Sequence, residues 1–194
     1  AQAARAALDR AVAAQSARIE EIDARRDLNA QLTGELQEAA RRLQASVAGL
    51  APDRAGPAAL PLAPFRGDLP WPASGTARSA FGRGRTSRFS AAIQRNGILI
   101  SAAEGDRVRA VHEGRVAYAS PFTGFGNLVI VEHGEGDYSL YGHLRALGVA
   151  RGDAVERQAV LGEIGVTPSG VPGLYFELRI DGRAVDPLQW LKRR

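Results

Sequence analysis

Apolar residues in the first fifty positions recur at steps of three, four or seven, which predicts one long helix over residues 1–49. Asn29 falls in register with this narrow seam, where a polar residue specifies the pairing of a coiled coil at some cost in stability. At about 1.5 Å per residue the helix would extend about 75 Å. No partner helix follows downstream, so we expect the partner upstream or on another molecule. The stripe comprises Leu8, Val12, Ile19, Ile22, Leu32, Leu36, Leu43, Val47 and Leu50.

A proline-rich stretch, "APDRAGPAALPLAPFRGDLPWP", follows the helix after Gly49. Proline fixes the backbone in extended conformations and interrupts both helices and sheets, so such a segment typically forms a stiff linker. We predict a linker over residues 50–72, between the helix and a separate domain over residues 73–194.

The period of the pattern changes to two after about Thr76. Short runs rich in Val, Ile, Leu and Tyr are separated by glycine-containing turns such as "GFGN" and "GEGD", which is typical of β-hairpins. We therefore predict an all-β domain of antiparallel sheets, which closes with a short helical turn in "PLQWLKRR". The predicted strands cover residues 97–101, 107–111, 114–120, 127–134, 138–144, 159–165 and 174–180.

The net charge of +4 is concentrated in the middle of the chain. An arginine-rich stretch without an acidic residue is either a solvated loop or an attraction to an acidic partner. Nucleic acid is not expected as a partner, because no nucleic-acid module or aromatic stacking platform accompanies the charge. The stretch contains Arg78, Arg83, Arg85, Arg88 and Arg95.

Cysteine is absent from the sequence, which excludes disulfides, cysteine-ligated zinc and cysteine nucleophiles. No apolar run reaches the length of about 18 residues that a membrane-spanning helix needs. The first residues already follow the helical pattern, without a charged and apolar leader before them, so we expect a signal peptide to lie outside this sequence.

Several motifs of the β-domain together resemble the LytM, or lysostaphin-type, zinc metallopeptidase domain over about residues 70–192. They are "GILISAAEGDRVRAVHEGRVAYASPFTGFGNLVIVEHGEGDYSLYGHL", "RGDAVERQAVLGEIG" and "GLYFELRIDGRAVDPLQWL", in the order of the family. The resemblance implies that active members bind zinc through the His and Asp of an H-x-G-x-D segment and the last His of an H-x-H strand. A His in a Y-x-H-L segment and the first His of H-x-H would assist the zinc-bound water.

The positions of these ligands hold other residue types in this sequence. Arg95 stands at the first His position and Leu99 at the Asp position, while Gly173 and Tyr175 replace both His of H-x-H. Only His143, in "YGHL", is kept, as a relic or as a hydrogen-bonding wall of the groove. A catalytic zinc needs about three protein ligands and an open position, so we expect neither a metal cofactor nor peptidase activity.

A degenerate LytM domain behind a coiled coil and a proline-rich linker resembles the EnvC family of murein hydrolase activators. The segments "GILISAAEG", "VEHGEGDYSLYG" and "LYFELR" have the form of that family, whereas His143 departs from it. The resemblance implies a non-catalytic, periplasmic activator whose partners are N-acetylmuramoyl-L-alanine amidases. The vacant groove would capture a regulatory helix of the amidase and relieve its autoinhibition during cell division.

The same resemblance implies a partner-binding groove and two roles for the N-terminal helix. The helix over residues 1–49 would either be recruited by an FtsEX-type complex or restrain the groove. Arg95 and Arg179 would pair with acidic residues of an amphipathic partner helix, while core packing is the alternative for each apolar residue. The groove residues are Arg95, Asn96, Leu99, Phe125, Leu128, Tyr141, His143, Tyr175 and Arg179.

Two other hypotheses stay open at this level. One is a module that binds peptidoglycan without activating an enzyme. The other is a zinc endopeptidase with atypical ligands, which would have to recruit His112 and His133. Their spacing matches no zinc motif, so we expect both to be ordinary strand-end or turn histidines.

Overall fold

The computed structural model describes residues 38, 41–43, 45–47, 49, 60–79, 81–84 and 93–193. All of these except Glu38 belong to one compact unit, Arg41–Arg194. The predicted coiled coil over residues 1–49 lies mostly outside the described residues, of which 38, 41–43 and 45–47 are helical. Among the residues described, no helix is long and apolar enough to cross a membrane.

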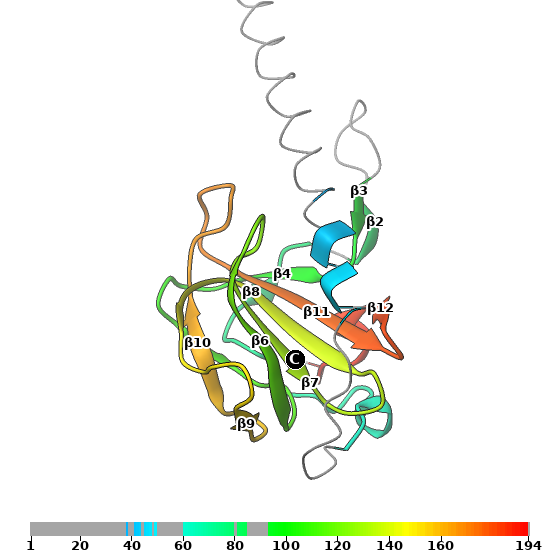
Figure 1. Ribbon diagram of the computed structural model, residues 1–194. Coiled ribbons are helices and arrows are strands. Elements are labelled where there is room, and N and C mark those ends of the chain that lie inside the picture. The colour runs from blue at the N-terminus through cyan, green and yellow to red at the C-terminus, as the bar shows by residue number, and fades with distance from the viewer. Residues whose placement is uncertain are drawn as a thin grey trace, which may run out of the picture. The chain divides into compact units, whose positions relative to one another are not determined.

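The predicted all-β domain is confirmed, because the described strands pair antiparallel throughout (Figure 1). The strands are β1 (Thr76–Ala77), β2 (Gly82–Gly84), β3 (Ile93–Arg95), β4 (Ile98–Ser101), β5 (Arg107–Arg109), β6 (Gly114–Phe122), β7 (Gly126–Glu132), β8 (Tyr138–Leu147), β9 (Ala154–Val155), β10 (Val160–Ile164), β11 (Leu174–Ile180) and β12 (Arg183–Val185). Two 3-10 turns, η1 (Ala63–Phe65) and η2 (Pro187–Gln189), complete the described elements. Each predicted run overlaps one of these strands, and β11 has the predicted bounds.

Ten of the described strands form one sheet, in the order β1-β4-β11-β8-β7-β6-β9. Off this path, β10 pairs with β5 and β8, and β12 pairs with β11, while β2 and β3 form a separate ribbon. Strands β8 and β11 run through the middle of the sheet (Figure 1). The two ligand segments of the family resemblance therefore meet at the centre of the sheet, on β4 and β11.

Strand β11 shows how the sequence pattern divides the sheet into two faces. Leu174, Phe176 and Leu178 are completely buried in the hydrophobic core. Successive side chains of a strand point to opposite faces, so Tyr175 and Glu177 lie on the other face. Most of that second face is buried too, which explains why the central strands have nearly continuous apolar runs.

The described part of the predicted linker packs onto the sheet. Leu62 and Leu69 are completely buried in the core, and Leu69 forms an isolated parallel bridge with Leu191. The amide of Leu62 donates to Asp137 Oδ2 at 2.8 Å, and the indole of Trp71 donates to the carbonyl of Lys192 at 2.9 Å. The predicted boundary at 72/73 stays a prediction, but residues 60–72 behave as a strap across the domain.

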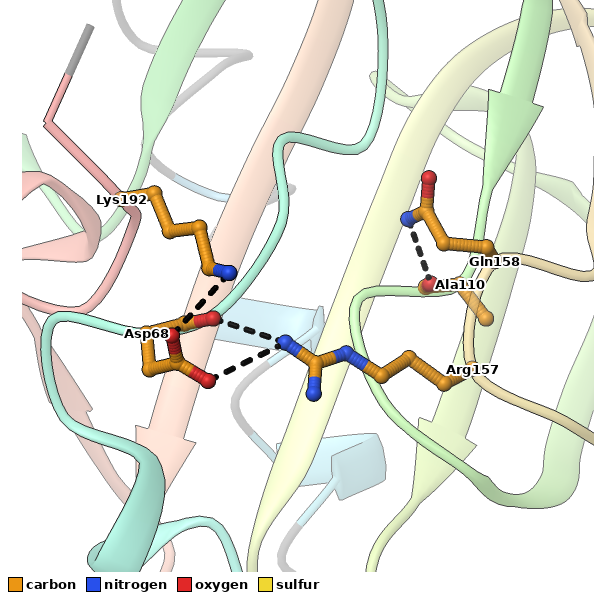
Figure 2. Close-up of polar contacts among 5 residues, drawn as sticks. All are labelled: Asp68, Ala110, Arg157, Gln158 and Lys192. Atoms are coloured by element: carbon orange, nitrogen blue, oxygen red, sulfur yellow. Dashed lines mark hydrogen bonds and ion pairs between the residues drawn. The ribbon is translucent and has the colours of Figure 1, made fainter.

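Polar contacts at the surface hold this strap to two distant segments (Figure 2). Arg157 donates to the carbonyl oxygen of Asp68 at 2.8 Å, and Lys192 Nζ lies 3.1 Å from Asp68 Oδ1. Nearby, Gln158 donates to the carbonyl of Ala110 at 3.3 Å. The hydrogen bond from Lys192, more than any other contact, lowers the pKa of the Asp68 carboxyl. These groups are exposed, so each pair adds little to stability, and the buried leucines anchor the strap.

Candidate functional site

The strand register brings the substituted ligand positions together. Tyr175 of β11 pairs with Leu99 of β4 on one side and with Gly142 of β8 on the other. His143 follows Gly142 directly, so the residue kept from the family pattern lies beside the residues that replace its ligands. Leu99, His143 and Tyr175 are all partly exposed. We call this surface the groove floor.

Aromatic rings occupy the groove floor. The ring centroids of Phe125 and Tyr175 are 4.9 Å apart with an interplanar angle of 62°, and Phe125 stacks on His143 at 6.2 Å. His143 and Tyr175 complete a triangle at 6.3 Å. Phe122 extends the group from the end of β6, 6.2 Å from Phe125. Edge-to-face and stacked rings at these distances attract one another, so the cluster is preformed. Phe125 is buried at its centre, and Phe122, His143 and Tyr175 are partly exposed.

A buried polar chain runs along β11 behind this aromatic cluster. The hydroxyl of Tyr175 donates to Glu177 Oε2 at 2.5 Å, and Arg179 Nε donates to Glu177 Oε1 at 2.7 Å. Glu177 and Arg179 are 0% and 4% exposed. Burial raises the pKa of Glu177, with Arg179 opposing the shift, and burial, followed by the charge of Glu177, raises that of Tyr175 well above its usual value.

Two glycines allow the neighbouring backbone to approach this strand closely. A Cβ atom at Gly97 would lie 2.5 Å from the carbonyl oxygen of Phe176 and 3.0 Å from Tyr175 Cζ. The turn between β3 and β4 therefore rests directly on β11. A Cβ atom at Gly173 would lie 3.0 Å from the carbonyl oxygen of Ile100, so a histidine at this family position would require the strands to shift.

The residues at the groove floor do not fit a zinc ion. Zinc needs deprotonated nitrogen, sulfur or carboxylate ligands, and the positions of the family's ligands hold Arg95, Leu99 and Tyr175. The Tyr175 hydroxyl donates a hydrogen bond to Glu177, whose other oxygen accepts one from Arg179. Within the described residues no three His, Cys, Asp or Glu side chains lie close enough to hold a metal.

His143 has an unusual backbone conformation that links the two sides of the groove floor. Its φ of 62° lies in the left-handed region, which non-glycine residues rarely adopt. In this conformation its amide donates to the carbonyl of Phe125 at 2.6 Å, and its carbonyl accepts from the amide of Gly165 at 2.8 Å. Burial lowers the pKa of its imidazole to about 4, so the ring is neutral at pH 7 and acts as an apolar wall.

The structure separates the other predicted groove residues by face and burial. The register pairs Tyr141 with Phe176, which puts Tyr141 on the core face and away from Tyr175. Leu128 and Arg179 lie on the groove side of the sheet but are buried. Arg95 and Asn96 are partly exposed beside the β3–β4 turn.

The remaining histidines belong to the core and not to the groove. His133 is completely buried, with Nδ1 at 2.6 Å from the carbonyl oxygen of Glu113 and Nε2 at 2.7 Å from Ser139 Oγ. His112 packs against Phe65 of the strap, with ring centroids 4.4 Å apart. Their burial agrees with the expectation of structural histidines.

Sequence reasoning missed Phe122 and the hairpin between β10 and β11, both of which border the groove floor. The signal for the hairpin was present in "GVTPSGVPG", an uncharged run bounded by glycines at residues 165 and 173. None of residues 166–172 stands at a ligand position of the family pattern, so the pattern assigns them no role.

Comparison with known proteins agrees with this geometry. Residues 94–187 match the model of Peptidase family M23. The chain is 37% identical over 129 residues to the murein hydrolase activator EnvC of Escherichia coli, an alignment that covers 66% of this chain and 30% of EnvC.

The β-domain is an M23 domain.

Other relatives of this M23 domain fit the same assignment. The chain is 40% identical over 147 residues to a lipoprotein NlpD/LppB homolog of Pseudomonas aeruginosa, covering 75% of this chain and 45% of the relative. Among solved structures, Csd3 of Helicobacter pylori superposes with a TM-score of 0.55 at 26% identity, over 65% of this chain and 33% of Csd3. The chain thus spans less than half the length of each of these relatives.

Proposed function

We propose that this M23 domain is a non-catalytic activator of N-acetylmuramoyl-L-alanine amidases in the bacterial envelope. The proposal rests chiefly on the groove floor, where an aromatic cluster and a tyrosine–carboxylate–guanidinium chain stand at the positions of the family's zinc ligands. It is supported by the E. coli relative, which is named a murein hydrolase activator. A groove of this kind binds and does not hydrolyse.

The proposed mechanism is capture of a regulatory helix from the amidase. Leu99, His143 and Tyr175 offer partly exposed apolar surface to one face of an amphipathic helix. Binding would favour the open state of the amidase by a population shift. Moving a 1:99 equilibrium to 99:1 requires about 5.5 kcal/mol of differential binding, which corresponds to about 220 Å² of buried apolar surface at roughly 25 cal/mol per Å².

We further propose that the helix preceding the domain restrains this groove. Leu43 and Val47 are 1% and 2% exposed, and Leu128 and Arg179, on the groove side of the sheet, are buried as well. Arg42, Ala45 and Ser46 line a cavity of about 470 Å³ together with Pro121, Phe122 and Thr123, next to the turn that carries Phe125. Recruitment of the coiled coil by an FtsEX-type complex would then release the restraint at the division site.

The test is dye release from labelled murein by the zinc amidase of the same genome, with and without the full chain. Release should increase with the protein and should not occur with the protein alone. Leu99→Glu should abolish the increase, whereas Val160→Glu, at an exposed position of β10, should retain it. No increase with wild-type protein would refute the activator proposal. Binding to sacculi without an effect on the amidase would instead favour a peptidoglycan-binding module.

A second measurement tests the restraint. Leu43→Asp should weaken the seating of the helix, because it places a charge at a buried apolar position. We expect activation to increase over wild type at equal protein concentration. An unchanged or lower activation by a folded Leu43→Asp variant, as judged by circular dichroism, would contradict the restraining role.

A further inference from the structure

The hairpin between β10 and β11, residues 165–173, is held rigidly by its own hydrogen bonds. Val166 and Pro172 form an isolated antiparallel bridge. The side chain of Thr167 donates to the carbonyl of Val171 at 2.8 Å, and the amide of Thr167 donates to the same oxygen at 3.0 Å. Its conformation is therefore fixed before any partner arrives, which lowers the entropy cost of binding.

The hairpin is joined directly to the groove floor. The amide of Gly165 donates to the carbonyl of His143 at 2.8 Å, and the amide of Gly173 donates to the carbonyl of Gly165 at 3.2 Å. A Cβ atom at Gly173 would lie 3.6 Å from Leu99 Cδ1 and 3.7 Å from Thr167 Cγ2. In Figure 1 the hairpin rises from the sheet at the same end as the β6–β7 turn, and both connect to His143.

The hairpin exposes apolar side chains where most of the second sheet face is covered. Val166 and Val171 are 47% and 37% exposed, and residues 165–173 contain no charged side chain. Two exposed valines on one uncharged, rigid hairpin beside a binding groove are typical of an interaction surface. Leu128 and Arg179, by contrast, are buried and could contact a partner only after a rearrangement.

Charge favours one class of occupant. The border of the groove floor beside β1 and β3 is basic: the amide of Arg78, just after β1, donates to the carbonyl of Leu99 at 2.7 Å, and Arg95 ends β3 just before the turn into β4. Neither arginine forms an ion pair with a described residue. The two borders together therefore complement a helix with an apolar stripe on one side and acidic residues on the other.

We propose that the hairpin of residues 165–173 is the first docking wall for such an amphipathic, acid-flanked helix of the partner, and that Val166 and Val171 make the contact. This inference rests on the proposed activator function and names a contact outside the groove floor. Because the two valines are exposed in the structure as it stands, the partner helix contacts them before the floor is cleared.

The test compares variants of matched exposure in the full chain. The double variant Val166→Ser/Val171→Ser removes the apolar contact. The control Val160→Ser/Leu188→Ser removes two apolar side chains of similar exposure, 38% and 42%, elsewhere on the domain. The probe is the purified zinc amidase of the same genome, with its affinity measured by titration and its activation by dye release. The hairpin variant should bind at least tenfold more weakly, while the control should bind within twofold of wild type.

The outcomes separate the two proposals. Activation by wild type together with undiminished affinity of the hairpin variant would refute the docking wall and leave the activator function intact. Absence of activation by wild type would refute the activator function and the docking wall with it. Equal losses in the hairpin variant and in the control would also count against the docking wall, because a contact at the hairpin requires the two to differ.

Discussion

Two buried polar networks lie on opposite faces of the central strands, and they differ in charge. The groove network runs from Tyr175 through Glu177 to Arg179 along β11 and contains a buried ion pair. The core network joins His133, Ser139 and Tyr141 with Ser139 Oγ at 2.9 Å from Tyr141 Oη, and contains no acidic or basic charge at pH 7.

The two networks differ in whether their buried groups are charged at pH 7. Burial lowers the pKa of His133 to about 4 and raises that of Tyr141 to about 12. Both groups thus stay neutral at pH 7. Their hydrogen bonds satisfy the buried polar atoms of the core network without burying a charge. The groove network keeps a guanidinium and a carboxyl group out of water. Their desolvation costs free energy that is offset only if the two groups pair with each other. Burial of polar residues alone therefore does not mark a functional site, and the proposed site rests instead on a buried charge pair beside a partly exposed surface.

The largest expected effect comes from breaking the groove network. Glu177→Ala leaves the guanidinium of Arg179 buried, with only the carbonyl of Gly182 at 3.4 Å as a described acceptor. We expect the free energy of unfolding to fall by about 3–5 kcal/mol, measured by urea denaturation at pH 7.

The matched control is the exposed pair of Arg145 and Glu163, whose oxygen and nitrogen atoms are also 2.7 Å apart but whose side chains are 52% and 40% exposed. Glu163→Ala should cost less than about 1 kcal/mol, because water already screens this pair. If both variants lose the same stability, the buried pair has no special role and the comparison fails.

The next effect separates the networks by pH. His133 has a folded pKa of about 4 and an ordinary value of 6.5 when unfolded, so between these values the unfolded chain binds more protons. The stability held by the neutral imidazole is complete above about pH 6.5 and is lost as the pH falls toward 4, by up to roughly 3 kcal/mol.

His133→Gln should flatten the fall in unfolding free energy over that range. Comparing the variant with wild type at each pH cancels the contributions of the other histidines and of Asp137 and Glu177. An unchanged pH slope would show that His133 does not carry the effect.

The sequence was sufficient for seven of the twelve described strands of the β-domain, because alternation and glycine turns are local properties. The run at 174–180 matches β11 residue for residue. The two-residue strands β1 and β9 are too short to show a period. The prolines of residues 60–72 indicate a linker and conceal the spacing of Leu62 and Leu69, so the pattern does not predict the strap. Which apolar residues join a core depends on contacts between distant segments, such as Leu69 with Leu191.

The groove was less predictable, because the face of the sheet on which a side chain lies depends on the strand register. The register pairs Leu99 with Tyr175, two positions that the motifs assign to one site. Motif positions could not show that Tyr141 pairs with Phe176 and faces the core. Nor could they show that Arg179 is bound internally by Glu177. The residue type of His143 likewise does not predict its left-handed backbone conformation. In this conformation the backbone of His143 joins the turn of Phe125 to the hairpin.

The smallest expected effects compare one hydroxyl in each network. Tyr175→Phe removes a donor from Glu177, which still has Arg179, so the cost should be about 1 kcal/mol. Ser139→Ala leaves His133 Nε2 without its partner and removes a contact of Tyr141, both completely buried, and should cost more, about 2 kcal/mol. Urea denaturation of both variants at pH 7 decides the order. The order follows from the number of groups that each change leaves unsatisfied; the reverse order would mean that the charged network, and not the neutral one, depends on its hydroxyl.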